Sequence, residues 1–374
     1  MAIDRRTLLG LAAAGVAIGP ARLVAGTVPG EGEDPAPAER YASAARLPDG
    51  SYGVIVFSAR GEVERSFPLS ARGHDIVQSH DGRRLVVFAR RPGTFAVVID
   101  LANREAPVVI SARADRHFYG HGLFSPDDRL LYATENDFDG ARGVLGVYDM
   151  AGGFQRIGEL PTHGVGPHDL TLLADGRTLC VANGGIETHP DSGRAKLNLD
   201  SMRPSLAFID RHSGDLVACH ELIAELAALS IRHLAADAEG RIWFGGQWQG
   251  RVDLSPTLIG RAGPDQPIAL LDPLADFGPQ LNGYVGSVAT SADGRILAAS
   301  SPRAGRTVLI DTASGRLVGR FDMADCCGVA PAGAREIAVS SGLGDVAIVD
   351  RAAQSAPRLT WPGTAFDNHL LRLA

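Results

Sequence analysis

The chain has 374 residues, of which 45% are hydrophobic and 21% are charged, and its mean hydropathy is +0.03. These values exclude a disordered chain and a protein with many membrane spans, and they leave enough apolar material for a large core. The net charge of −7 argues against a protein that binds nucleic acid. Glycine is frequent, with 45 residues scattered between short apolar runs, which indicates many tight turns.

Residues 1–26 have the pattern of a twin-arginine export signal. Residues 4–9 carry the arginine pair, residues 8–18 form an apolar run, and residues 23–25 offer a small-residue cleavage site. The apolar run is too short to span a membrane, although an uncleaved N-terminal anchor is the alternative interpretation. We therefore predict a periplasmic protein that has no membrane span in its mature form. Residues 27–40, rich in Pro, Gly and Glu, are expected to form a flexible leader.

From Tyr41 onward, one unit of four short apolar strands recurs. Its first hairpin closes on a turn of the Asp-Gly-Arg type, found at residues 80–83, 126–129, 174–177, 238–241, 292–295 and 332–335. Its third strand ends in Asp at residues 98–100, 147–149, 208–210, 309–311 and 348–350. Four short strands that repeat every roughly 40 to 50 residues are typical of a β-propeller.

Six turns mark six complete units, and the two ends of the chain supply a seventh. Residues 366–373 match the first strand of a unit that has nothing after it, and residues 41–46, 52–58 and 63–69 supply the three missing strands. Such a closure removes the exposed edges that an open stack of sheets would leave. We therefore predict an all-β, seven-bladed propeller over residues 41–374, closed by the C-terminal strand joining the N-terminal strands in one blade. Six or eight blades are the alternatives.

Histidine is scarce, with 11 residues, yet five histidines occupy the same position within the repeat. They are, in chain order, His74, His121, His168, His233 and His369. The first two intervals are 47 residues each, and an insertion at residues 186–204 lengthens the third. Cys327 occupies this position in a further unit, and the remaining unit has Gly286 or Ser287 there.

This repeated position is the beginning of the innermost strand of each blade, which lines the central channel. Side chains there are expected to crowd around the axis at one mouth, where neutral imidazoles beside a thiolate suit a transition metal such as iron, copper or zinc. Strong participation of Cys327 would favour copper or zinc. Glu135 and Asp137 are auxiliary ligand candidates. The carboxylates expected to orient the histidines are those of Asp75, Asp169 and Asp367.

The same mouth is expected to collect the long loops between second and third strands, together with the insertion. The loop residues predicted to contact a ligand are Asn136, Asn183, His189, Asn198, Arg203, Gln247 and Arg303. Two alternatives to a metal remain open at this stage. One is a polar site for an organic or anionic ligand. The other is a purely structural role, as in propellers where a Gly-His pair such as Gly73-His74 hydrogen-bonds within its blade.

The four cysteines do not form a disulfide scaffold. Cys180 and Cys219 fall within apolar strand patterns, which is typical of packed thiols. Cys326 and Cys327 are adjacent, and adjacent cysteines rarely satisfy the geometry of a disulfide.

Longer motifs extend over nearly the whole mature chain. They include FYGHGLFSP at 118–126, ATENDF at 133–138, PTHGVGPH at 161–168, KLNLDSMRPS at 196–205, SIRHL at 230–234, YVGSV at 284–288 and DNHL at 367–370. Together they resemble the secreted bacterial domain-of-unknown-function 1513 family. The resemblance implies a seven-bladed propeller in the cell envelope, and it implies partners from iron-uptake gene clusters, namely imelysin-like and dihaem oxidoreductase-like proteins. It highlights His121, Glu135, Asn136, Asp137, His168, Asn183, His189, His233 and His369.

These observations favour a non-catalytic periplasmic propeller that binds or handles a transition metal, as an accessory of metal uptake. The enzyme alternative is a lactonase-like hydrolase or an oxidoreductase subunit, in which Glu135 or Asp137 would act as general base on a metal-activated water. The sequence has no nucleophile motif and no Cys-x-x-Cys-His haem-attachment pattern. A third alternative is a metal-free scaffold that docks an envelope partner through the face with the long loops.

Overall fold

The computed structural model describes residues 22–23, 38–91, 93–103, 105–193, 195–271, 281–355 and 357–374. The predicted export signal and leader fall mainly on residues 1–21 and 24–37, which lie outside the described residues. Within the described ranges, no helix has both the length and the apolar character needed to cross a membrane.

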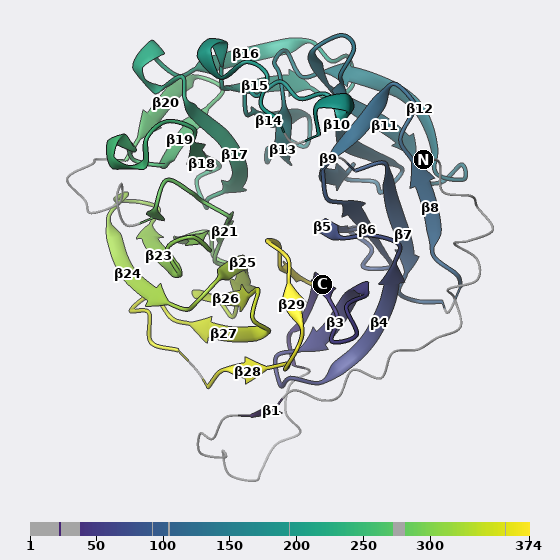
Figure 1. Ribbon diagram of the computed structural model, residues 1–374, viewed down its shortest axis with the longest axis vertical. Coiled ribbons are helices and arrows are strands. Elements are labelled where there is room, and N and C mark those ends of the chain that lie inside the picture. The colour runs from purple at the N-terminus through teal and green to yellow at the C-terminus, as the bar shows by residue number, and fades with distance from the viewer. Residues whose placement is uncertain are drawn as a thin grey trace.

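Seven antiparallel sheets stand as blades around a central channel (Figure 1). Blade 1 consists of β5 (Gly73–Gln78), β6 (Arg84–Ala89), β7 (Phe95–Asp100) and β8 (Val108–Ser111). Blade 2 consists of β9 (Arg116–Phe124), β10 (Leu130–Asp137), β11 (Arg142–Asp149) and β12 (Gln155–Pro161). Blade 3 consists of β13 (Pro167–Leu172), β14 (Thr178–Asn183), β15 (Ser205–Asp210) and β16 (Leu216–Glu221).

The next three blades repeat this order. Blade 4 consists of β17 (Leu229–Ala236), β18 (Ile242–Trp248), β19 (Ile259–Gly263) and β20 (Gln266–Leu270). Blade 5 consists of β21 (Ser287–Thr290), β22 (Ile296–Ser301), β23 (Arg306–Asp311) and β24 (Leu317–Asp322). Blade 6 consists of β25 (Cys326–Ala332), β26 (Glu336–Ser341), β27 (Asp345–Val349) and β28 (Leu359–Thr360), with β1 (Arg22–Leu23) added at its outer edge.

Four one-turn 3₁₀ helices lie in the connections between these strands. They are η1 (Pro190–Ser192), η2 (Leu199–Ser201), η3 (Ala224–Leu226) and η4 (Val252–Leu254). The first two belong to the insertion that lengthens the connection between β14 and β15.

Blade 7 joins the two ends of the chain and confirms the predicted ring closure. Its strands are β29 (Ala365–Phe366), β30 (Leu371–Arg372), β2 (Arg40–Arg46), β3 (Tyr52–Ser58) and β4 (Val63–Leu69). Both C-terminal strands pair with β2, and Figure 1 shows the yellow C-terminal segment beside the purple N-terminal strands. The Ser43 hydroxyl also donates a hydrogen bond of 2.8 Å to the backbone oxygen of His369. The predicted seven-bladed architecture is therefore the observed one.

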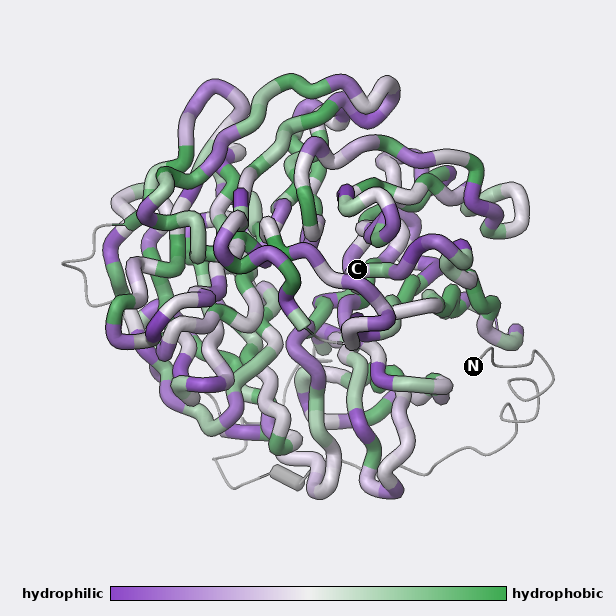
Figure 2. The backbone as a smooth tube through the Cα atoms, turned by 45° about the horizontal axis from the view of Figure 1, so that its top comes forward, coloured by the Kyte–Doolittle hydropathy of each residue, from purple (hydrophilic) through white to green (hydrophobic). Residues whose placement is uncertain are grey.

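The described core is divided into seven apolar clusters, one between each pair of neighbouring blades. Between blades 1 and 2, for example, the rings of Phe88 and Phe118 lie 5.8 Å apart, and both side chains are buried. Hydrophobic and hydrophilic stretches consequently alternate along the chain throughout the molecule (Figure 2). Because each blade packs mainly on its two neighbours, the centre of the ring is left for polar side chains.

The hairpin turns opposite the long loops need a left-handed residue. In blade 1, Gly82 supplies it, with φ of 71°, whereas in blade 2 the residue is Asp128, with φ of 55°. Asp128 compensates for this rarely adopted conformation, because its carboxylate accepts hydrogen bonds of 2.8 and 2.9 Å from the backbone N–H groups of His80 and Asp81 in the neighbouring turn. The turn thereby ties blade 2 to blade 1.

Candidate metal centre

A β-bulge interrupts several inner strands at the position of the periodic histidine. The register shifts between Gly73 and Ile76 in β5 and between Pro167 and Asp169 in β13, and β9 and β17 are irregular at the corresponding places. A bulge leaves one residue unpaired with the neighbouring strand and re-aims its side chain. This local irregularity accompanies the turning of the imidazoles into the channel.

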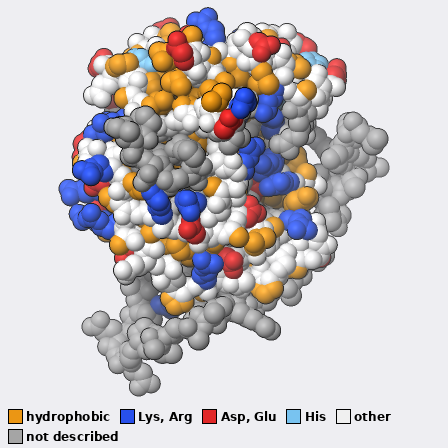
Figure 3. Space-filling view, turned by 60° about the vertical axis from the view of Figure 1, so that its left-hand side comes forward, with side chains coloured by type: hydrophobic (Ala, Val, Ile, Leu, Met, Phe, Trp, Pro, Cys, Tyr) orange, Lys and Arg blue, Asp and Glu red, His pale blue; other side chains and the backbone are white. Residues whose placement is uncertain are grey.

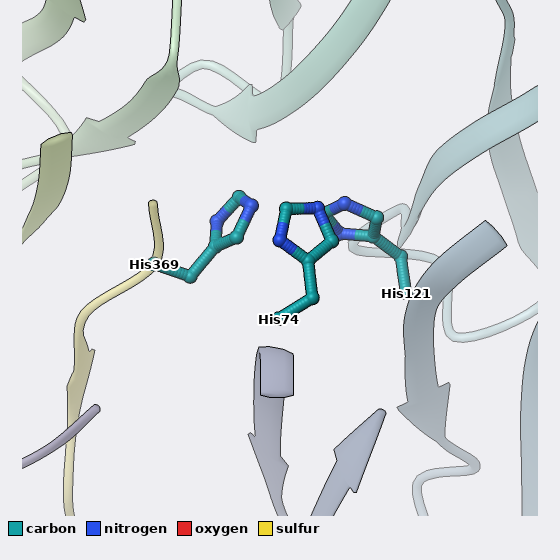
Figure 4. Close-up of side chains that lie close together, drawn as sticks. All are labelled: His74, His121 and His369. Carbon is teal, nitrogen blue, oxygen red and sulfur yellow. The ribbon is translucent and has the colours of Figure 1, made fainter. Parts of the chain in front are cut away.

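The five periodic histidines meet within the channel. The ring centroids of His74 and His369 lie 4.6 Å apart, those of His121 and His168 also 4.6 Å, and those of His168 and His233 4.8 Å. Two sets of three offer ligand atoms within 4.8 Å of one another. One set is His74, His121 and His369, whose rings point toward one another in Figure 4, and the other is His121, His168 and His233.

Burial keeps all five imidazoles neutral. It lowers the pKa of His74, His168 and His233 well below the ordinary value, and it lowers the pKa of His121 as well. The pKa of His369 falls to about 4, mainly through burial. Neutral imidazole is the form that binds a metal, so the cluster needs no deprotonation at neutral pH to act as a ligand set.

A carboxylate faces the Nδ1 atom of His74. The Oδ1 atom of Asp367 lies 3.1 Å from it, and the same carboxylate accepts hydrogen bonds from Arg72 and Arg90. Burial by itself would raise the pKa of Asp367, but its contacts with His74, Arg90 and Arg72 outweigh this and hold the pKa well below its usual range. Because neutral His74 keeps its proton on Nδ1 and donates it in a hydrogen bond to Asp367, its lone pair is on Nε2.

Two further carboxylates, those of Asp75 and Asp169, lie near the Nδ1 atoms of His121 and His369. The Nδ1 atom of His121 lies 3.4 Å from Asp75 and 3.5 Å from Asp169, and the Nδ1 atom of His369 lies 3.9 Å from Asp75. The Nε2 atoms of both histidines are buried and have no hydrogen-bond partner. Such orphaned nitrogens are costly unless a ligand satisfies them. Burial also raises the pKa of both Asp75 and Asp169 to about 6.

His168 and His233 have different surroundings. Arg232 donates a hydrogen bond of 3.2 Å to the Nδ1 atom of His168. In neutral His168 the proton must then lie on Nε2, which removes the lone pair from that atom. Neither ring nitrogen of His233 has a hydrogen-bond partner.

The histidine cluster separates two cavities of the channel. The cavity at the long-loop mouth has a volume of about 530 Å³ and is lined by His74, His168 and His233. The cavity on the other side has a volume of about 400 Å³ and is lined by His121, His233 and His369. Asp75 and Asp169 also line this second cavity, so the two carboxylates face the side away from the long loops.

Cys327 is not brought into either set of potential ligands. Its thiol is buried and donates to the backbone oxygen of Asp367, with 3.1 Å between sulfur and oxygen, and it packs in the apolar cluster between blades 6 and 7. Burial raises its pKa to about 12, so a thiolate is disfavoured. The register of β25 shifts between Cys326 and Val329, and this bulge does not aim the thiol into the channel.

Glu135 and Asp137 also lie apart from the histidine sets. Glu135 is completely buried within blade 2, where it accepts hydrogen bonds from Tyr148 at 2.6 Å and Arg156 at 2.8 Å. Asp137 pairs with Arg142 at 2.6 Å and with Arg116 at 3.0 Å. Both carboxylates therefore have structural partners within blade 2 and do not contact the histidine sets. The carboxylates that lie beside the histidines are those of Asp75, Asp169 and Asp367.

Several predicted loop residues hold the insertion in place. Asn136 donates to the backbone oxygen of Thr188 at 2.8 Å. Asn198 accepts from the backbone N–H of Glu187 at 2.7 Å, and His189 accepts from that of Asp191 at the start of η1. These side chains therefore hold the insertion at the mouth and are not part of the histidine sets.

The other predicted loop residues divide between the mouth and the surface. Asn183 donates to the backbone oxygen of Thr162 at 2.8 Å, and Arg203 forms an exposed ion pair with Glu221. Gln247 and Arg303 do line the mouth cavity.

Of the cations that line the mouth, the sequence predicted Arg303 as a ligand contact but not Arg91, Lys196 or Arg232. Arg232 is 7% exposed, and burial together with the charge of Arg91 lowers its pKa to about 10, so it stays charged at neutral pH. One sequence signal was available. An arginine precedes His233, whereas the residues that precede the first three periodic histidines are Gly73, Gly120 and Pro167.

Comparison with known proteins assigns the family. The model of the family described as "protein of unknown function (DUF1513)" matches residues 67–373. The chain belongs to this family. The family membership expected from the sequence motifs is thereby confirmed. No curated protein matches this DUF1513 chain in sequence.

Solved structures share the fold of this DUF1513 protein. Kuenenia stuttgartiensis hydrazine synthase matches with a TM-score of 0.62 and 17% identity, over 83% of this chain and 95% of that chain. The β-propeller domain of Myceliophteria thermophila Cps50 (Swd1) matches with a TM-score of 0.57 and 14% identity, over 91% of this chain and 99% of that chain. Identities this low support a common fold and carry no statement about activity.

Proposed function

We propose that this DUF1513 protein binds a divalent transition metal through His74, His121 and His369. The observation that carries the proposal is the orientation of these rings. Each Nδ1 atom faces a carboxylate, that of buried Asp367 at 3.1 Å for His74 and that of half-buried Asp75 at 3.4 Å for His121 and 3.9 Å for His369. An outer carboxylate that fixes the tautomer and leaves Nε2 for the metal is the usual arrangement of histidine ligands.

The second histidine set is less suited to the same task. His168 accepts a hydrogen bond from Arg232, so its Nε2 atom carries a proton, and the adjacent guanidinium repels a cation. His121 belongs to both sets, and its Nδ1 atom already faces Asp75 and Asp169. We therefore assign one metal to the set that contains His74.

Three neutral imidazoles suit iron, copper or zinc and leave coordination positions for water or another ligand. A bound metal would supply Lewis-acid character to whatever occupies those positions. The contribution of the chain is to hold three neutral rings together in the channel and to orient them through the carboxylates beside their Nδ1 atoms. In the cell, we assign this site to metal handling in the periplasm as an accessory of iron uptake, with imelysin-like and dihaem oxidoreductase-like proteins as partners.

Elemental analysis of the protein purified after native export tests the proposal. The expected result is about one transition metal per chain, lost on chelation and restored by titration with one of Fe²⁺, Cu²⁺ or Zn²⁺. Failure of the chelated protein to take up any of these metals would overturn the assignment. Assay of the loaded protein with lactones and redox dyes, in parallel, tests the enzyme alternative.

A further inference from the structure

A buried guanidinium lies at the mouth of the channel without a carboxylate partner. Arg232 is 7% exposed, and among the described residues its guanidinium donates one hydrogen bond, from Nη1 to His168. Its Nε atom has no partner, and no described Asp or Glu forms an ion pair with it. Because an uncompensated buried charge is expensive, this arrangement indicates that an anion completes the site.

Further cations converge on the same cavity. Arg91, Lys196 and Arg303 line it together with Arg232, and none of the described lining residues is an Asp or a Glu. Lys196 donates to Gln249, which is neutral, and the Arg303 guanidinium lies 4.4 Å from the ring centroid of Tyr284. The outer surface in Figure 3 differs, since basic and acidic side chains are interspersed there.

The shape of the cavity limits what the anion can be. Its volume of about 530 Å³ lies in the range of sites for small organic molecules and far exceeds an inorganic oxyanion. Aromatic side chains of Tyr119, Trp248 and Tyr284 form part of its wall. A ligand that fits must therefore combine an organic body with more than one negative charge.

We propose that the mouth binds a small organic polyanion that carries two or more carboxylates. A planar carboxylate matches the fork of the Arg232 guanidinium, and a second carboxylate reaches Lys196 or Arg303. This inference goes beyond the metal site and does not depend on it, since the cations and the cavity belong to the chain itself. The test accordingly uses metal-free protein.

Lys196 offers a selective probe because it is the single lysine of the chain. Reductive methylation with ¹³C-formaldehyde keeps its charge and places one lysine signal in the mouth. The N-terminal amine gives a second signal that its lower pKa distinguishes. Titration with citrate, a tricarboxylate, is expected to shift the Lys196 signal with a dissociation constant below about 1 mM, and added NaCl is expected to weaken binding.

Variants make the assignment specific. Lys196→Gln and Arg303→Gln, followed by calorimetry with citrate, are each expected to weaken binding by about fivefold or more, and Arg232→Gln by a larger factor. Arg177→Gln is the matched control, because it removes one charge from an exposed arginine side chain that lies in the turn between β13 and β14 and pairs with Asp210. It is expected to leave citrate binding unchanged.

Three outcomes would overturn the inference. The first is no shift of the Lys196 signal and no heat at millimolar citrate. The second is equal binding of the neutral trimethyl ester of citrate, which would show that charge is not recognised. The third is equal binding of inorganic phosphate, which would show a simple oxyanion site. A protein that binds no metal but binds citrate would refute the metal proposal alone.

Discussion

The Nδ1 atom of His74 lies 3.1 Å from the Oδ1 atom of Asp367, although the two residues are 293 positions apart in the chain. His74 belongs to the first strand of blade 1, and Asp367 lies between the two C-terminal strands that close blade 7. The same C-terminal segment carries His369 into the cluster. The segment that closes the ring therefore also completes the histidine set.

Replacement of single histidines distinguishes the two sets. We expect His369→Gln to weaken metal binding by more than the roughly 10- to 100-fold that loss of an outer carboxylate costs, because a direct ligand is removed. His168→Gln is the matched control and is expected to leave the affinity nearly unchanged, since glutamine can still accept the hydrogen bond from Arg232. Competition titration with a chromophoric chelator measures both. A stronger loss in His168→Gln than in His369→Gln would contradict the assignment.

Asp75→Asn separates metal binding from stability. The Asp75 carboxylate lies 3.4 Å from the Nδ1 atom of His121 and 3.9 Å from that of His369. In the proposed site it orients both rings, so its loss is expected to lower metal affinity by about 10- to 100-fold. Burial raises the pKa of Asp75 to about 6, which means that the folded state resists the charged form. At pH 8 the metal-free variant is therefore expected to unfold at a higher denaturant concentration than the wild type. Lower stability together with unchanged affinity would contradict this role.

Acid is expected to destabilise the metal-free protein below pH 6.5. The folded state holds the five channel histidines neutral, with pKa values lowered by burial, whereas the unfolded chain protonates them near their ordinary pKa of about 6.5. Below pH 6.5 the unfolded state binds more protons than the folded state. The contribution of the histidines to the free energy of unfolding is therefore fully present above pH 6.5 and is lost as the pH falls toward the folded pKa, which is about 4 for His369.

Asp75 and Asp169 act in the opposite direction in the same pH range. Their raised pKa of about 6 lets the folded state take up protons as the pH falls, which offsets part of the loss. Each histidine contributes at most about 1.4 kcal/mol per pH unit, and five histidines outweigh two carboxyls. Denaturant unfolding at pH 7.5 and 5.5 is expected to show a net loss of several kcal/mol. A smaller loss in His121→Gln would link the effect to the channel.

Thiol reactivity checks the position of Cys327. Cys180, Cys326 and Cys327 are buried, and burial raises their pKa values, so they are expected to be inert toward a disulfide reagent in the native protein. Cys219 is exposed on the outer strand of blade 3, in contrast to the packed position that its apolar surroundings in the sequence suggested. One thiol is therefore expected to react in the native state, and none in Cys219→Ser. Rapid labelling of Cys327 would place it in the channel.

The periodic features of this protein were predictable from the sequence alone. The strand repeat predicted seven blades, and residues 366–373 predicted the closure, because the first and last blades of a propeller can pack on each other only when the chain ends join. The recurrence of His74, His121 and His168 at intervals of 47 residues predicted that these side chains share one level of the channel. Equivalent positions in equivalent blades must occupy equivalent places around the axis.

Only the tertiary structure decided which of the candidates face one another. Cys327 has the same position in the repeat as the histidines, yet its thiol enters the core, because a bulge can turn a side chain to either face. Glu135 accepts hydrogen bonds from Tyr148 and Arg156 within its own blade. Asp367 contacts His74 only because ring closure places blade 7 beside blade 1. A repeat places a residue along a strand, but the direction of its side chain and its partner in a distant segment depend on the packed three-dimensional structure.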